Sequence, residues 1–221
     1  MPRIVVGIAI AVVIAAAIGI AAYRLSPERV EDAVAPPVTP EAVVVFEDDF
    51  ILGDPGAPVT MIEFASLTCP HCASFHRDIL PQLKKDYIDT GKMRLVYRDF
   101  PTSPVELALA AAMLARCGGE DRFFGFVEVL YRSQERWSRS ENPRRELEQI
   151  ARMGGMSRAD FDACVDDKAL LENLQARTRR DEARYGIRSA PSFILNGRKL
   201  SRVQTVEDFR DVLDSALARN R

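Results

Sequence analysis

Two cysteines three positions apart, in the stretch Cys69-Pro70-His71-Cys72, are the residues of this chain best suited to chemistry. Such a pair can bind a metal ion, brace a turn as a structural disulfide, or exchange electrons with other thiols. A zinc site needs four ligands, typically a second C-x-x-C pair or two closely spaced histidines. The chain offers only single cysteines and two histidines, one of them inside the motif, so the pattern disfavours a metal site.

The position of the motif favours redox chemistry over a structural disulfide. The apolar run 59–65 reads as a buried strand, and Cys69 opens a helix that we expect to reach about residue 89. A thiolate at a helix start faces unpaired N–H groups, which lower its pKa. We therefore predict that Cys69 is the nucleophile.

The neighbours of Cys69 fit this assignment. Pro70 stands at a first-turn position, where a missing N–H costs nothing, and His71 can add stabilisation to the thiolate. Cys72, one turn further in, is expected to be more buried and to act as the resolving thiol.

Glu63 interrupts the otherwise apolar strand before the motif. A buried acid costs free energy unless it has a partner or a task. Six residues ahead of Cys69, it is predicted to lie beneath Cys72 and to relay its proton. The alternative is a solvated position at a strand edge.

Ser189-Ala190-Pro191-Ser192 supplies a second element of a site. A proline that begins an otherwise central strand after a loop of small residues is a candidate for a cis peptide bond. The ordinary alternative is a trans proline at the strand start.

The remaining pattern predicts one α/β domain with a helical insertion. The first strand, its helix (kinked at Pro81) and a second strand at 93–98 form a parallel βαβ unit. Helix signals follow at 103–117 (a capping box from Ser103 to Glu106), 121–137, 142–154, 157–164 and 168–185. A hairpin at 191–200 turns at Asn196-Gly197, and a last helix runs from Thr205 to about 218.

The N-terminus predicts export. Residues 4–22 form a run without charged or strongly polar side chains, and this run is long enough to cross a bilayer as an anchor. Triplets of small residues within it also fit the cleavage site of a signal peptide. Residues 26–45, with four prolines, read as an extended tether. We thus expect an anchor or signal peptide at 1–25, a tether at 26–45 and a folded domain at 46–220, with the insertion at about 101–179. The net charge of −2 and the absence of a basic run disfavour a nucleic-acid partner.

Export changes the interpretation of the other two cysteines. An even count of four cysteines in an oxidising compartment suggests disulfides. We expect Cys117 and Cys164 to join two helices of the insertion, against the alternative of two buried free thiols. His76 reads as a helix-surface residue, and the arginine-rich stretch 177–184 reads as a solvated face.

Taken together, these motifs resemble the DsbA-type thiol:disulfide oxidoreductases, which have a thioredoxin fold. The resemblance covers residues 46–218. It rests on five stretches, namely Gly53-Asp54-Pro55 with Ala57-Pro58-Val59, Glu63-Phe64 before the Cys69–Cys72 motif, Arg98-Asp99-Phe100-Pro101, Gly186-Ile187 leading to Pro191-Ser192-Phe193, and Asn196-Gly197. It implies a mixed central sheet flanked by helices, a cis Pro191, and a contribution of the Ala190 backbone to substrate binding. This position is commonly Val or Thr in the family.

The resemblance also implies an activity. Pro-His between the cysteines is similar to the oxidising members, so the pair is expected to oxidise reduced, unfolded exported proteins and to be reoxidised by a quinone-linked membrane partner similar to DsbB. Neither a metal nor an organic cofactor is expected. The competing functions are a disulfide isomerase or reductant, a redox partner for cytochrome or copper-site assembly, and a non-enzymatic binding module.

Overall fold

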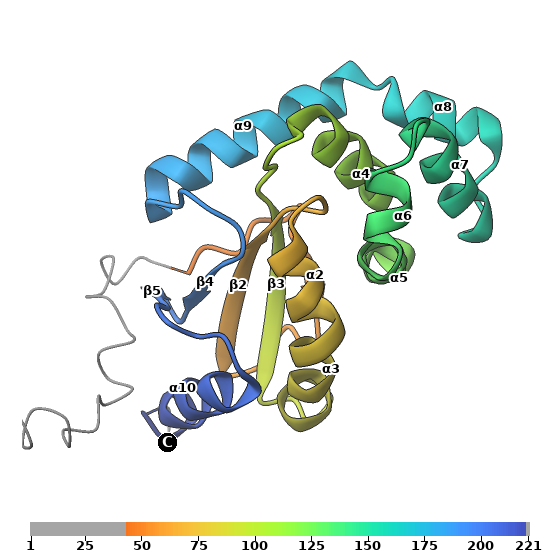
Figure 1. Ribbon diagram of the computed structural model, residues 1–221. Coiled ribbons are helices and arrows are strands. Elements are labelled where there is room, and N and C mark those ends of the chain that lie inside the picture. The colour runs from red at the N-terminus through yellow and green to blue at the C-terminus, as the bar shows by residue number, and fades with distance from the viewer. Residues whose placement is uncertain (1–42, 220–221) are drawn as a thin grey trace, which may run out of the picture. The chain divides into compact units, whose positions relative to one another are not determined.

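A five-stranded mixed sheet forms the centre of the domain (Figure 1), in a computed structural model that describes residues 43–219. The predicted membrane segment at 4–22, and the predicted tether up to residue 42, lie outside the described residues. Within residues 43–219, no helix is long and apolar enough to span a bilayer.

The two central strands are the parallel pair that the sequence predicts. β2 (Val59–Ala65) runs beside β3 (Met93–Asp99), and every residue of β2 is buried. β4 (Ser192–Leu195) pairs antiparallel with β2 and continues through the predicted turn into β5 (Arg198–Lys199). The strand order is β1-β3-β2-β4-β5, where β1 (Phe50–Leu52) is an antiparallel edge strand that the sequence analysis missed.

The helical stretch after β2 is divided into α-helical and π-helical turns. It consists of α2 (Pro70–Ser74), η2 (Phe75–Ile79), α3 (Leu80–Leu83) and η3 (Lys84–Ile88). Pro81 lies in the first turn of α3, where its missing N–H is tolerated. The turns change from π-helical to α-helical at Leu80, just before this proline, and the kink expected at Pro81 stays a prediction.

The insertion between β3 and β4 is helical, as predicted, with two local differences. Its helices are α4 (Val105–Cys117), α5 (Glu120–Arg132), α6 (Gln134–Ser138), α7 (Pro143–Met153), α8 (Arg158–Val165) and α9 (Lys168–Tyr185). The predicted capping box at Ser103 is wrong, because Pro104 follows a cis peptide bond and α4 begins only at Val105, without a side-chain cap. The single helix predicted at 121–137 breaks at Ser133 into α5 and α6.

A disulfide ties the insertion together. Cys117, the last residue of α4, is bonded to Cys164 near the end of α8, with Cα atoms 6.1 Å apart. The structure thus contains the predicted bond between two helices. It closes a loop of 47 residues, which restricts the unfolded chain.

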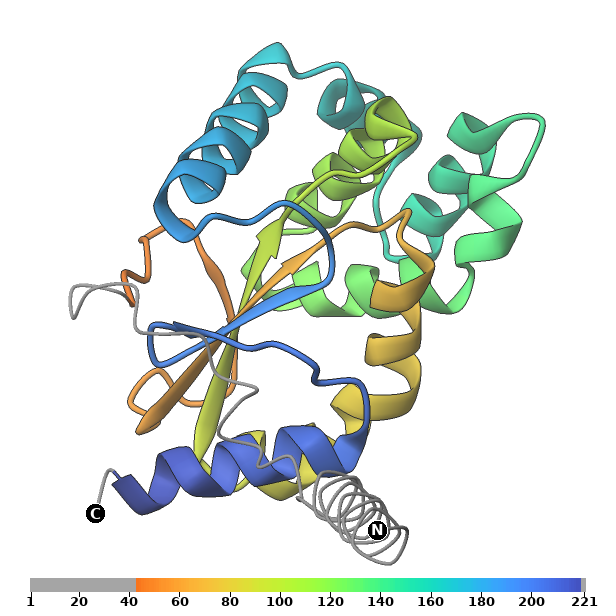
Figure 2. The same cartoon turned by 60° about the vertical axis from the view of Figure 1, so that its left-hand side comes forward.

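The alternation of β2 side chains separates two cores. Met61 faces η2, α3 and α10 (Val206–Arg219), where it packs with Phe75 and Phe209. Phe64 faces the opposite side, where the end of α9 and the segment around Val43 cover it (Figure 2). Because side chains alternate along a strand, Glu63 shares the face of Met61 and points toward the helix that follows the cysteines.

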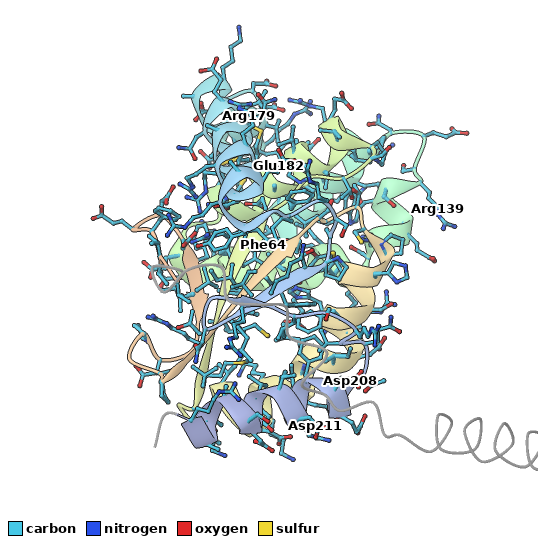
Figure 3. The ribbon with its side chains drawn as sticks, turned by 90° about the vertical axis from the view of Figure 1, so that its left-hand side faces the viewer. Phe64, Arg139, Arg179, Glu182, Asp208 and Asp211 are labelled. Carbon is cyan, nitrogen blue, oxygen red and sulfur yellow. A yellow bond between two sulfur atoms is a disulfide. The ribbon has the colours of Figure 1, made fainter. Side chains whose placement is uncertain are left out.

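The face of α9 predicted to be solvated is only partly so. Arg179 and Glu182 are exposed and point away from the sheet (Figure 3), but Arg177 and Asp181 are buried. The prediction is wrong for these two residues because their partners are distant in the sequence. Arg177 pairs with Asp49, and Asp181 pairs with Arg98 of β3.

Candidate active site

The two cysteines lie at the start of α2 in unequal environments. Cys69 is the N-cap residue, in an extended conformation, and Pro70 is the first helical residue. Cys69 is 7% exposed and Cys72 is fully buried, as the sequence analysis predicted. The described structure holds both as free thiols, so it represents the reduced pair.

The surroundings of Cys69 favour its thiolate. They lower its pKa from 9.0 to about 6, first through a hydrogen bond from the Cys72 thiol, against the opposing effect of burial. The backbone N–H groups of Cys72 and His71 and the charge of His71 lower the pKa further. The helix start thus contributes as predicted, but the largest contribution comes from the second cysteine.

Cys72 is held as a thiol. Burial raises its pKa well above the usual range, and the hydrogen bond to Cys69 and the negative charge of Glu63 act in the same direction. The pair therefore consists of a less buried sulfur that ionises easily and a fully buried sulfur that keeps its proton. This is the asymmetry that nucleophilic thiol exchange requires.

Glu63 is fully buried, and its partner is His76, which the sequence analysis expected on the helix surface. Nε2 of His76 lies 2.9 Å from Oε2 and 3.1 Å from Oε1 of Glu63. The interpretation of His76 as a helix-surface residue is wrong, since only 6% of its side chain is exposed. A residue four positions after Cys72 lies on the same face of the helix as Cys72, and this spacing was a signal that could have identified it.

The loop before β4 completes the site. The peptide bond between Ala190 and Pro191 is cis, and the Cys69 thiol donates a hydrogen bond of 3.3 Å to the carbonyl oxygen of Ala190. The structure thus brings together Glu63, Cys69, Cys72 and the loop of Pro191. His71 and Pro70 are exposed beside them, whereas the Cys117–Cys164 disulfide lies elsewhere, in the insertion.

Gln134 of α6 is a supporting residue that the sequence analysis missed. Its buried side chain donates hydrogen bonds to the carbonyl oxygens of Leu67 (2.8 Å) and Cys69 (3.0 Å). These carbonyls belong to the loop that positions the first cysteine, so the insertion holds that loop in place. No local pattern marks such a residue, because its acceptors lie more than sixty positions away in the chain.

We expect the substitution Gln134→Leu to destabilise the protein by about 2 kcal/mol, because it leaves the carbonyl oxygen of Leu67 without its donor and removes one of the two donors to the carbonyl oxygen of Cys69, which keeps only the N–H of Ala73. Unfolding in urea measures the change. Glu135→Leu, at the neighbouring position with a side chain 79% exposed, is the matched control and should change stability by less than about 0.5 kcal/mol. Equal effects of the two substitutions would contradict a supporting role for Gln134.

The described residues contain no group of three or more His, Cys, Asp or Glu side chains arranged to hold a metal ion. The chemistry that the site can perform with its own atoms is thiol–disulfide exchange. Cys69 can attack or be attacked, and Cys72 can resolve the resulting mixed disulfide.

Comparison with known proteins agrees with this geometry. The family model described as Thioredoxin matches residues 46–215. The crystal structure of Wolbachia pipientis alpha-DsbA1 is 30% identical and superimposes with a TM-score of 0.76, covering 82% of this chain and 96% of that one. It supports the predicted thioredoxin fold with a helical insertion.

Curated relatives point to the same group. A protein of Rickettsia bellii named "Putative protein-disulfide oxidoreductase" is 36% identical over 68% of this chain. The match covers 58% of that relative, so this chain spans less than two thirds of its length. A Bacillus anthracis protein named "Probable disulfide bond formation protein D" is 28% identical over 66% of this chain and 69% of its own length. The chain belongs to the thioredoxin family, and within it to the DsbA-type thiol:disulfide oxidoreductases.

Proposed function

We propose that this protein is an exported oxidase of dithiols that donates the Cys69–Cys72 disulfide to other exported proteins. The observation that carries the proposal is the opposite shift of the two cysteine pKa values, downward for Cys69 and upward for Cys72. A disulfide whose reduced form is stabilised accepts electrons readily. The names of the relatives support the same class of reaction.

The cycle follows from the geometry. A substrate thiolate attacks the Cys69 sulfur of the oxidised pair, and Cys72 leaves with the electron pair of the broken bond. A second substrate thiolate then attacks the substrate sulfur of the mixed disulfide, and Cys69 leaves as a thiolate. The substrate is oxidised by two electrons and the enzyme is left as a dithiol.

Roles follow for the residues around the pair. Glu63 exchanges a proton with Cys72. His71 and Pro70 set the environment of Cys69. The backbone of Ala190 and Pro191 binds an extended segment of the substrate. The Cys69 sulfur lies 3.3 Å from the carbonyl oxygen of Ala190. A substrate backbone bound to Ala190 would therefore lie close to the reacting sulfur. The Cys117–Cys164 disulfide has a structural role.

The partners and location belong to the same proposal. The substrates are reduced, cysteine-containing exported proteins, and a quinone-linked membrane protein similar to DsbB reoxidises the dithiol. Residues 1–25 serve as a membrane anchor or signal peptide, and residues 26–45 tether the domain of 46–220 outside the cytoplasm.

The pH dependence of stability tests the proposal. A lowered pKa in the folded state stabilises the reduced protein fully above the ordinary value of 9.0, and this contribution is lost as the pH falls through about 6. As the pH rises from 6 to 9, the free energy of unfolding of the reduced form should therefore increase by about 3 kcal/mol relative to that of the oxidised form. Denaturant unfolding of both forms measures the gain, and an unchanged difference would remove the basis of the proposal.

Equilibration with glutathione gives the direction of electron flow. A disulfide donor should have a reduction potential well above about −270 mV, the value of thioredoxin. A potential at or below that value would assign the protein to the reductants instead.

A further inference from the structure

The two groups that exchange a proton at the resolving cysteine have no direct contact with solvent. The side chains of Cys72 and Glu63 are both fully buried. Because burial holds Cys72 as a thiol, every opening or closing of the disulfide adds a proton to Cys72 or removes one. A proton that reaches the Glu63 carboxylate needs a further group to carry it to water.

His76 lies at the position where such a group is needed. Its Nε2 is within 2.9 Å and 3.1 Å of the two carboxylate oxygens of Glu63. The residue belongs to η2, which follows directly after the helical turn that carries Cys72. His76 therefore links β2 to the helical stretch of residues 70–88, called here the active-site helix.

His76 also lines a cavity. A cavity of about 510 Å³ lies between the active-site helix and α5, and its lining includes His76, Leu80, Lys84, Phe124, Glu128 and Tyr131. The cavity is partly open to the surface and four charged side chains border it, so water can enter. The imidazole thus stands between a buried carboxylate and a solvated cavity.

Among the titratable groups around His76, the imidazole is the group suited to carry a proton. Burial keeps the pKa values of Tyr97 and Tyr131 well above the usual range, so both phenols stay protonated. Their rings lie 5.9 Å and 4.3 Å from the imidazole and hold it in place. The charged groups that line the cavity are Arg77 and Lys84 on the active-site helix and Glu128 and Arg132 on α5. An imidazole exchanges protons near neutral pH, which arginine and lysine do not.

We propose that His76 carries protons between the Glu63 carboxyl group and the water of this cavity, and so sets the rate at which Cys72 enters and leaves its disulfide. The inference rests on the proposed redox function of the pair. It adds a proton path that leaves on the side of the active-site helix facing α5.

The protons balance in both directions. When a thiolate opens the disulfide at Cys69, Cys72 leaves with the electron pair and takes a proton from the Glu63 carboxyl group, which His76 replaces from water. When Cys72 attacks a mixed disulfide on Cys69, its proton passes to the Glu63 carboxylate, then to His76 and to water. The substrate sulfur leaves Cys69 with the electron pair of the broken bond.

Reduction of the oxidised protein by excess glutathione tests the inference, with acid quenching and mass analysis at intervals over about pH 5 to 8. This step can be measured whether the protein proves to be a disulfide donor or a reductant, so failure of the proposed function would not obscure the result. We expect His76→Ala to slow the step about tenfold or more near neutral pH, because a proton carrier is lost. Free imidazole, which can enter through the cavity, should restore most of the rate in a saturable way.

Two further variants make the outcome decisive. His76→Gln keeps a hydrogen bond to Glu63 but cannot carry a proton, so it should be slow, with a flattened pH profile, even if His76→Ala does not fold. Arg77→Gln, at the next position and in the lining of the same cavity, should react like the wild type and show no response to imidazole. A folded His76→Gln or His76→Ala protein that reacts within about twofold of the wild type, or a slow His76→Ala protein that imidazole leaves slow, would overturn the proposal.

Discussion

Replacing Cys69 by serine is expected to abolish disulfide exchange, with a loss of at least about a thousandfold in the rate of oxidation of a reduced peptide. Cys69 is the less buried cysteine of the pair, and its pKa of about 6 gives it thiolate character at neutral pH. A serine hydroxyl cannot form the disulfide that the substrate attacks. Loss of free thiols from the peptide measures the rate.

The same sulfur-to-oxygen change at Cys72 should have a different result. Cys72 is fully buried. In Cys72→Ser, the Cys69 thiolate can still attack a peptide that carries a disulfide, so that a mixed disulfide forms and the other peptide sulfur leaves as a thiolate, but the thiol that resolves the mixed disulfide is missing. The protein should therefore accumulate linked to its substrate on a non-reducing gel. If Cys69→Ser kept its activity, or if Cys72→Ser and Cys69→Ser trapped substrate equally, the assignment of the two roles would be wrong.

Removing the charge of Asp49 should destabilise the fold by about 3–5 kcal/mol, because it removes the fully buried carboxylate that two buried arginines share and leaves them only Asp181 and the more exposed Asp48 as partners. The Asp49 side chain is fully buried and lies 2.7 Å from both Arg98 and Arg177, whose side chains are 1% and 6% exposed. Asp49→Asn keeps the shape of the side chain and changes its charge. Urea unfolding with an unchanged slope measures the loss.

Asp48→Asn is the matched control. Asp48 also pairs with Arg177, but 55% of its side chain is exposed, so water replaces much of the lost interaction. We expect a change below about 1 kcal/mol. A loss at Asp49 no larger than the loss at Asp48 would show that the buried cluster does not stabilise the domain as its geometry implies.

Local sequence signals were sufficient for much of the fold. Asn142 and Ser157 cap their helices through side-chain hydrogen bonds, and Gly186 ends α9 in a left-handed conformation, as such residues do. Asn196-Gly197 forms the hairpin turn with positive φ at both residues. In each case the signal lies within a few residues of the structure that it determines.

Features that depend on distant parts of the chain could not be predicted in this way. β1 has three residues, too few for a recognisable period, and exists because it pairs with β3. Gln134 and Arg177 are polar residues in helices, and nothing near them in the chain shows that their partners are buried. For His76, the spacing from Cys72 was visible, but the meeting with Glu63 depends on how the helix packs on the sheet.

The edges of the sheet have a consequence for the proposed reaction with reduced, unfolded proteins. The outer strands β1 and β5 contain only three and two residues, so each side of the sheet presents few free backbone groups. A long, open edge would offer an extended client a template for adding a strand and would invite aggregation. The short edge strands leave few backbone groups to which a substrate could add a strand. Under the proposed function, release of the substrate then depends on breaking its disulfide bond to Cys69.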